Sequence, residues 1–148
     1  MNEREVNPAQ AFASLKLLVG HWSGKNSEGA IYTVSYTSIA CDSSIVERWI
    51  FANGGEALTV YHMDGQSLIA AHFCPHSNQP RLRLSSKLQR NRLNFEIFDG
   101  SNIAVPGSSH QCQFDILIAS NTEFSRGETY KCFNDGTFEY ESVDYTRS

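Results

Sequence analysis

The sequence has no long apolar run. A membrane-spanning helix needs about 20 consecutive apolar residues, and no stretch of the 148 residues provides them. Residues 1–18 also lack the uninterrupted apolar centre of a secretory signal, because acidic and basic residues are mixed among them. We therefore expect a cytoplasmic protein without a membrane partner.

Cysteine is sparse, and its spacing excludes several kinds of site. No two of the four cysteines are closer than 20 residues: Cys41, Cys74, Cys112 and Cys132. The chain therefore has no Cys-x-x-Cys pair for metal or redox chemistry, and we expect reduced, buried thiols. It also lacks a His-Glu-x-x-His zinc motif, a Gly-x-Ser-x-Gly elbow and a Gly-rich phosphate loop. We expect no bound metal.

An excess of basic residues is missing too. Lysine and arginine number 12 against 16 acidic residues, which gives a net charge of −4. Binding of nucleic-acid phosphates needs a basic surface, so we expect no nucleic-acid partner. The local group of basic residues from Arg81 to Arg92 is interpreted as a solvated face.

What the sequence does have is a regular series of strand patterns. Turn signals such as Asp64-Gly65 and Asp99-Gly100 separate runs rich in Val, Ile, Thr, Tyr and Phe. Short connections favour antiparallel neighbours. The longest connection, residues 99–109, is either a lid or a mobile loop. We predict strands near 18–24, 30–40, 44–52, 56–63, 67–74, 81–88, 92–98, 110–119, 123–133 and 137–146.

A short helix is predicted before the first strand. It runs from Pro8 to about Leu17, with Asn7 as its cap and with Phe12, Leu15 and Val19 near one face. Residues 1–7 are expected to form a disordered tail. The fold prediction is all-β: residues 1–148 form a single closed up-and-down antiparallel barrel of about ten strands. A barrel this wide encloses a ligand cavity.

The start of the first strand resembles the start of the calycin barrels. Gly20-His21-Trp22 follows the short helix and is similar to the Gly-x-Trp motif of lipocalins, fatty-acid-binding proteins and nitrobindin-like proteins. In that group the tryptophan plugs one end of the barrel and a late arginine packs on it. The resemblance therefore implies barrel closure by Trp22 and Arg147.

A closer resemblance covers nearly the whole chain. It is to small bacterial lipocalin-like proteins with no established function, through Val46-Glu47-Arg48, residues 58–65, His72-Phe73-Cys74 and residues 78–81. Where those proteins have His-x-His, this chain has residues 110–112 with a cysteine in place of the second histidine. The resemblance implies the fold and a pocket, and it implies no reaction.

Side-chain alternation indicates which residues face the lumen. His110 and Cys112 share a face with Phe114, and Glu47 shares one with Trp49. A buried Glu47 needs a partner, either an arginine or a histidine.

The Asp64-Gly65 turn predicts that Ala57 lies opposite His72, which faces inward with Cys74. Arg81 and Arg83 face either the lumen or solvent. The predicted ligand-binding residues are Glu47, Tyr61, His72, Cys74, Gln79, Arg81 and His110.

Three functions stay open. We favour a protein that binds a small, partly apolar ligand, with an anionic group as one option, and in a subordinate version haem bound by one lumen histidine. The second is an isomerase- or cyclase-type enzyme that uses lumen His and Glu for proton transfer. The third is an interaction module, dimeric through surplus aromatics at Trp49, Phe51, Phe95 and Phe98. A zinc site at His62, His72 and His76 is a less favoured alternative.

Overall fold

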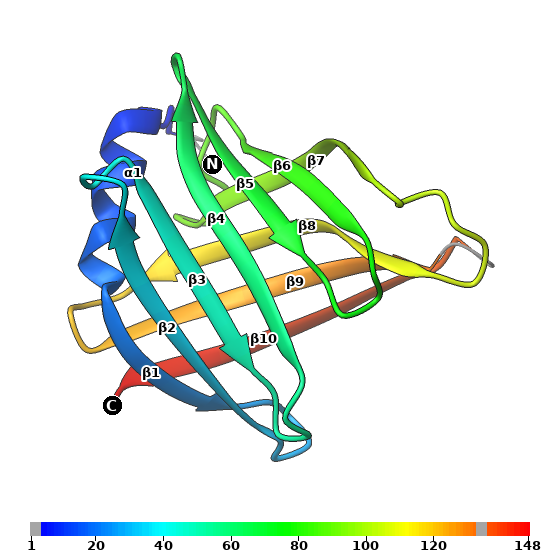
Figure 1. The fold of residues 1–148 in the computed structure, drawn as a ribbon. Helices are drawn as coiled ribbons and strands as arrows, with labels where there is room; N and C mark the ends of the chain where they lie inside the picture. The colour runs from blue at the N-terminus through cyan, green and yellow to red at the C-terminus, as the bar shows by residue number, and fades with distance from the viewer. Residues whose placement is uncertain (1–3, 133–135) are drawn as a thin grey trace.

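The chain forms one closed barrel of ten antiparallel strands with a short helix at its N-terminal end (Figure 1). The structure is a computed structural model and describes residues 4–132 and 136–148. Each strand pairs with its neighbours in sequence, and β1 pairs with β10 to close the barrel, as predicted. The strands are β1 (Gly20–Lys25), β2 (Ile31–Ile39), β3 (Ser44–Ile50), β4 (Glu56–Asp64), β5 (Ser67–Phe73), β6 (Gln79–Leu84), β7 (Leu93–Ser101), β8 (Ser109–Ile118), β9 (Glu123–Cys132) and β10 (Phe138–Arg147).

The β4–β5 hairpin differs from the prediction by an even shift. Asp64 pairs with Ser67, so the turn residues are Gly65 and Gln66, and Gly65 has a φ of 58°. His72 consequently lies opposite Thr59, and the predicted pairing with Ala57 is wrong. A shift by two residues leaves every side chain on its predicted face.

The N-terminal helix covers one end of the barrel. Helix α1 (Pro8–Leu15) continues as the 3₁₀-helix η1 (Lys16–Leu18), and the Asn7 side chain accepts a hydrogen bond from the Gln10 amide at 3.1 Å. Leu18 is buried, whereas Val19 is 42% exposed. Val19 was predicted to lie near the same face as Phe12 and Leu15, but the tighter 3₁₀ turn brings Leu18 inward instead. No helix among the described residues has the length and apolar character needed to cross a membrane.

Part of the expected N-terminal tail pairs with the barrel. The Val6 amide donates to the Ser86 carbonyl, and the Leu88 amide donates to the Arg4 carbonyl. The expectation of a disordered tail is therefore wrong for residues 4–6, because these backbone groups find partners after β6. Residues 1–3 lie outside the described part of the chain.

Trp22 and Arg147 close the barrel beneath the helix, as the calycin resemblance implies. The Trp22 indole donates to the Leu18 carbonyl at 2.7 Å, and the Arg147 guanidinium lies 4.3 Å from the ring centroid. Arg147 also donates to three backbone carbonyls. Gly20 has a φ of 135°, and a Cβ there would lie 2.5 Å from the guanidinium. The Gly-x-Trp motif therefore reflects the close approach of the last strand.

The half of the lumen next to α1 is filled by side chains, and we call it the packed half. Phe124 packs edge-on against Trp22 at 4.8 Å and against Tyr36 at 5.8 Å. Phe95 and Phe114 stack at 4.5 Å. Other buried members of the packed half are Phe12, Leu15, Leu18, Ile45 and Leu68.

Candidate functional site

An ion pair spans the lumen at the edge of the packed half. Glu47 projects from β3 and Arg126 from β9, and Arg126 Nη2 lies 3.2 Å from Glu47 Oε1. Their side chains are 0% and 1% exposed. A buried carboxylate without a partner would be costly, and the predicted need for an inward arginine or histidine is met by Arg126.

Glu47 accepts four hydrogen bonds. The hydroxyls of Tyr36 and Tyr61 donate to Oε2 at 2.7 Å each, and the Trp49 indole donates to Oε1 at 2.7 Å beside the Arg126 contact. Burial raises the pKa of Glu47, but the Arg126 charge and these donors outweigh burial and hold that pKa below its usual value. A carboxylate offers about four acceptor sites, so Glu47 has none left with which to take a substrate proton.

Tyr61 therefore serves to hold Glu47. Burial and then the Glu47 charge place the pKa of Tyr61 well above its ordinary value. The hydroxyl stays protonated and keeps donating to the carboxylate. Tyr61 was predicted to bind a ligand, and the structure places its hydroxyl on Glu47, outside the lining of the pocket beyond the ion pair.

Arg126 is held on both faces and at both terminal nitrogens. Its guanidinium lies 4.3 Å from the Phe114 ring centroid and 4.9 Å from that of Trp49. Nη2 donates to Glu47 and Nη1 donates to Glu128, and Nε has no partner within the described part of the chain. Burial lowers the pKa of Arg126, but the two carboxylates outweigh burial and raise it, so the side chain stays a cation.

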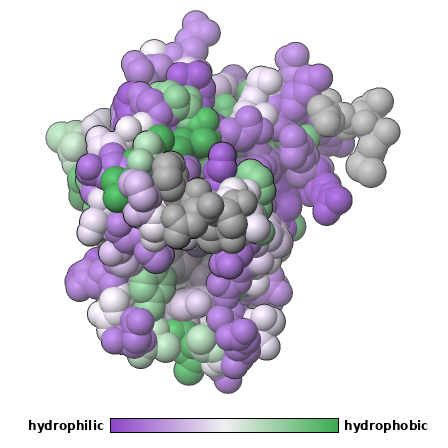
Figure 2. All heavy atoms as spheres, turned by 90° about the vertical axis from the view of Figure 1, so that its right-hand side faces the viewer, coloured by the Kyte–Doolittle hydropathy of each residue, from purple (hydrophilic) through white to green (hydrophobic). Residues whose placement is uncertain are grey.

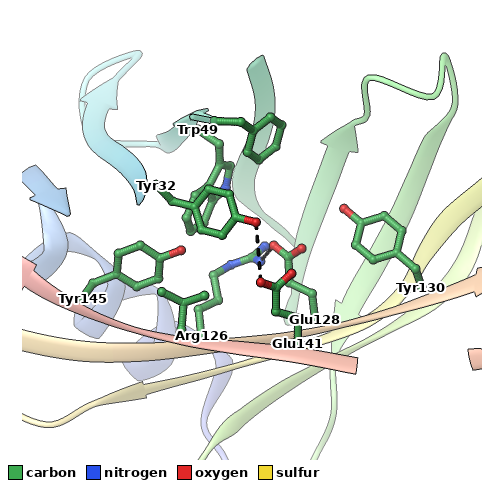
Figure 3. A pocket seen from close by; sticks show the side chains of 9 residues that line it. Tyr32, Trp49, Arg126, Glu128, Tyr130, Glu141 and Tyr145 are labelled. Atoms are coloured by element: carbon green, nitrogen blue, oxygen red, sulfur yellow. Dashed lines mark hydrogen bonds and ion pairs between the residues drawn. The ribbon is translucent and has the colours of Figure 1, made fainter. Parts of the chain in front are cut away.

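A pocket of about 170 Å³ lies beyond this ion pair, in the half of the lumen away from α1. We call it the lumen pocket. Its charged residues are Arg126, Glu128 and Glu141. Figure 3 shows the two carboxylates between Tyr32 and Tyr145 on one side and Tyr130 on the other. Its aromatic residues are Tyr32, Trp49, Phe51, Tyr130 and Tyr145.

The two carboxylates of the lumen pocket are neighbours. Glu128 on β9 pairs in register with Glu141 on β10. Burial raises the pKa of Glu128, Arg126 lowers it, and Glu47 and Glu141 raise it further, which leaves the pKa above its usual value. The Tyr32 hydroxyl lies 3.5 Å from Glu141 Oε1.

His72 and Cys74 face the lumen from β5 and its end, as predicted. His72 is 1% exposed and its Nδ1 lies 2.9 Å from Thr59 Oγ1, while its Nε2 finds no partner in residues 4–132 and 136–148. Burial and the Arg126 charge lower the pKa of His72 to about 3, so the ring is neutral at pH 7. Burial also raises the pKa of the Cys74 thiol. Neither residue belongs to the lining of the lumen pocket.

A β-bulge overturns the prediction for His110 and Cys112. The register of β8 against β9 shifts between Gln111 and Gln113, so Gln111 lies opposite Tyr130 on the lumen face. His110 lies opposite Lys131, and the Cys112 thiol donates to the Thr129 carbonyl. An extra residue at a bulge reverses the alternation, which places His110 and Cys112 in a groove on the outer face. Gln111 is fully buried, and its side-chain amide has no partner among the residues described.

Arg81 and Gln79 also lie outside the lumen. Arg81 donates to Asp99 at 2.6 Å, both side chains are about half exposed, and the guanidinium lies 4.8 Å from the Phe98 ring. Gln79 accepts a hydrogen bond from Asn102. The inward side chains of β6 are Pro80, Leu82 and Leu84, which are buried.

The aromatics that suggested a dimer are mostly used within the barrel. Trp49 and Phe95 are buried, and Phe51 lines the lumen pocket. Phe98 is covered by the guanidinium groups of Arg81 and Arg83. Figure 2 shows the face on the right of Figure 1, where hydrophilic atoms dominate and apolar atoms form separate groups. These four aromatic residues therefore do not provide the surplus aromatic surface on which the homodimer prediction was based.

The sequence predictions missed Arg126 and Glu128. The signal was available, because Phe124, Arg126, Glu128 and Tyr130 occupy alternate positions of one predicted strand. Apolar residues at both ends of that series indicate an inward face, and the charged residues between them share it.

A metal ion needs a group of suitable side chains, and haem needs a cavity of sufficient size. Among the residues that the structure describes, no three His, Cys, Asp or Glu side chains are grouped so that they could hold a metal ion. The lumen pocket, about 170 Å³, is below the roughly 300–1,000 Å³ of sites for drug-sized ligands. Haem is larger than most such ligands and does not fit this pocket.

Comparisons with known proteins support the fold alone. No family model matches the sequence, and no curated protein matches it either. One similar solved structure is a protein of unknown function from the DUF3598 family of Nostoc punctiforme, with a TM-score of 0.57 and 11% sequence identity. The match covers 99% of this chain and 51% of that chain, so this chain spans about half its length. The shared feature is the barrel.

Proposed function

We propose that this protein is a cytoplasmic, lipocalin-like binding protein that holds a small, partly apolar molecule in the lumen pocket. The observation that carries the proposal is a pocket of about 170 Å³ lined by five aromatic and three charged side chains. A cavity of about 150 Å³ is enough to admit benzene. We infer a ligand with the size of one aromatic ring and a polar group.

The walls of the pocket are held before any ligand arrives. Glu47 binds both Trp49 and Arg126, and these two side chains line the lumen pocket. Binding costs free energy when side chains must be ordered, and preformed walls reduce that cost. This arrangement supports binding of a rigid, ring-sized molecule.

Binding has more support than catalysis. The predicted base Glu47 has all its acceptor positions in use. His72 is neutral and does not belong to the pocket lining. The enzyme hypothesis required one of these residues to exchange a proton with a substrate.

An NMR titration with benzyl alcohol tests the proposal. The chain has two tryptophans, and only Trp49 lines the lumen pocket, since Trp22 lies in the packed half. We expect benzyl alcohol to shift the Trp49 indole N–H signal and to leave that of Trp22 in place. Native mass spectrometry of freshly purified protein would identify a molecule that co-purifies.

Two variants on one strand sharpen the titration. Val143→Phe adds a ring inside the lumen pocket, and Ser142→Phe adds the same ring on the exposed face of β10. We expect the first to abolish the Trp49 shift and the second to retain it. Val143→Leu serves if the larger side chain disturbs the fold. Equal binding by all these variants, or a benzyl alcohol shift at Trp22 alone, would contradict the proposal.

A further inference from the structure

We propose that the ligand of the lumen pocket carries a protonated amine, which Glu128 and Glu141 bind among tyrosine rings. The inference rests on the proposed function and names the class of ligand for the same site. It replaces the earlier expectation of an anionic group, which depended on Arg81. That residue lies on the outer face and is paired with Asp99.

The first step is the balance of charge around the pocket. Three carboxylates, those of Glu47, Glu128 and Glu141, surround one guanidinium, that of Arg126. His72 is neutral and adds no positive charge. Clefts lined by one sign of charge attract the opposite sign, so this lumen attracts a cation.

The second step concerns how much of the positive charge of Arg126 is available to a ligand. Its Nη2 is committed to Glu47 and its Nη1 to Glu128. Two carboxylates therefore already share the single positive charge of this guanidinium, and a ligand carboxylate would add a third negative charge beside it. Among the residues that the structure describes, Nε has no hydrogen-bond partner, in a side chain that is 1% exposed. Because its charge is already balanced, the donor at Nε suits a neutral acceptor on the ligand, such as a hydroxyl or ether oxygen.

The third step is the pair of carboxylates that lacks a full counter-charge. Glu128 and Glu141 are direct neighbours across β9 and β10. The ion pairs among the described residues do not include Glu141, and the Tyr32 hydroxyl donates to its Oε1 at 3.5 Å. Like charges directly opposite each other destabilise a sheet. An ammonium group between them would remove that repulsion and would gain two charge-assisted hydrogen bonds.

The fourth step is the aromatic surroundings. The rings of Tyr32, Tyr130 and Tyr145 stand around the two carboxylates (Figure 3). Aromatic faces attract ammonium groups and form the cages that bind amine ligands in other proteins. An anion would meet the same negative ring faces with repulsion. The tyrosine rings and the carboxylates therefore both favour a positively charged ligand.

Three ligands of one size test the inference by the Trp49 indole signal. Benzylamine, benzyl alcohol and benzoate share a ring and differ in charge. We expect benzylamine to bind at least tenfold more tightly than benzoate, with benzyl alcohol between them. Added salt should weaken benzylamine binding, because exposed charges are screened.

A matched pair of variants locates the effect. Glu141→Gln removes a carboxylate from the pocket, and Glu123→Gln removes an exposed one from the far end of β9. We expect the first to weaken benzylamine binding about two- to fivefold, the range for a partly exposed charge pair. It should leave benzyl alcohol binding unchanged. The Glu123 variant should bind all three ligands as the wild type does.

The outcomes separate this inference from the proposed function. Benzoate binding as tightly as benzylamine, or equal benzylamine binding by the two variants, would overturn the amine assignment and leave a binding pocket in place. If none of the three ligands moves the Trp49 signal, both the amine assignment and the pocket proposal fail.

Discussion

The two halves of this barrel are built from the same strands and have opposite interiors. On β9, Phe124 packs among rings in the packed half, while Glu128 and Tyr130 line the lumen pocket six residues or fewer further along. Helix α1 closes one end, so side chains there can form a core. The ion pair of Glu47 and Arg126 lies at the boundary. The comparison shows that one strand can supply structure at one end and a binding surface at the other.

Removing the positive charge of Arg126, at the boundary between the two halves, should change the free energy of unfolding more than any other substitution considered. Arg126→Leu leaves Glu47 buried without its counter-charge. Breaking a buried ion pair by removing one partner costs about 3–5 kcal/mol. We expect a loss of that size in the free energy of unfolding, measured by urea denaturation. The double variant Glu47→Leu, Arg126→Leu should recover most of it, and a double variant as unstable as the single one would show that the charge is not the cause.

Truncating one ring in each half should give unequal losses. Phe124 is buried against Trp22 and Tyr36, so Phe124→Ala should lower the free energy of unfolding by about 3–4 kcal/mol. Tyr32 is partly exposed at the lumen pocket, and Tyr32→Ala should cost about 1 kcal/mol. Urea denaturation of both variants measures the difference. Similar losses would mean that the two halves are equally packed.

Acid should destabilise the protein through His72. The pKa of His72 falls from 6.5 to about 3 on folding, so the unfolded chain binds a proton that the native state refuses. This contribution is complete above pH 6.5 and is lost as the pH falls towards 3. At pH 5 the stability lost, relative to a pH well above 6.5, is about 2 kcal/mol. We expect His72→Gln to lose that much less stability than the wild type between pH 7.5 and pH 5, by urea denaturation; equal losses would refute the assignment.

The smallest effect is expected on the outer face. Arg81→Ala breaks a half-exposed pair with Asp99 and removes one of the two guanidinium groups that cover Phe98. Since this side chain lies outside the lumen, the dissociation constants for benzylamine and benzyl alcohol should match those of the wild type. A change in either constant, measured by the Trp49 titration, would return Arg81 to the site.

The fold could be predicted because its signals are local. Turn residues and β-branched runs gave ten strands within a few residues of their bounds, and Asn7 marked the start of α1. On strands without a bulge, alternation predicted correctly whether a side chain points into the lumen, as for Glu47 and His72. The β4–β5 register was shifted by two residues, which preserves facing, whereas the bulge in β8 adds one residue and reversed it for His110. The residue types at positions 110–112 do not predict that bulge.

The partner of Glu47 was harder to predict because the contact is long-range. Arg126 lies 79 residues away in the sequence. Alternation places Arg126 on the inward face, but it does not tell which inward residue on which strand it meets. That choice depends on the stagger of all ten strands around the barrel.

The pairing of β1 with β10 has a consequence during synthesis. Trp22 on β1 pairs with Arg147 on β10, so the ring of strands is complete only after β10 has been synthesised. Until β10 emerges from the ribosome, β1 and β9 each present an open edge, and open edges invite pairing with other chains. A chain that lacks β10 should therefore depend on chaperones far more than the closed barrel does.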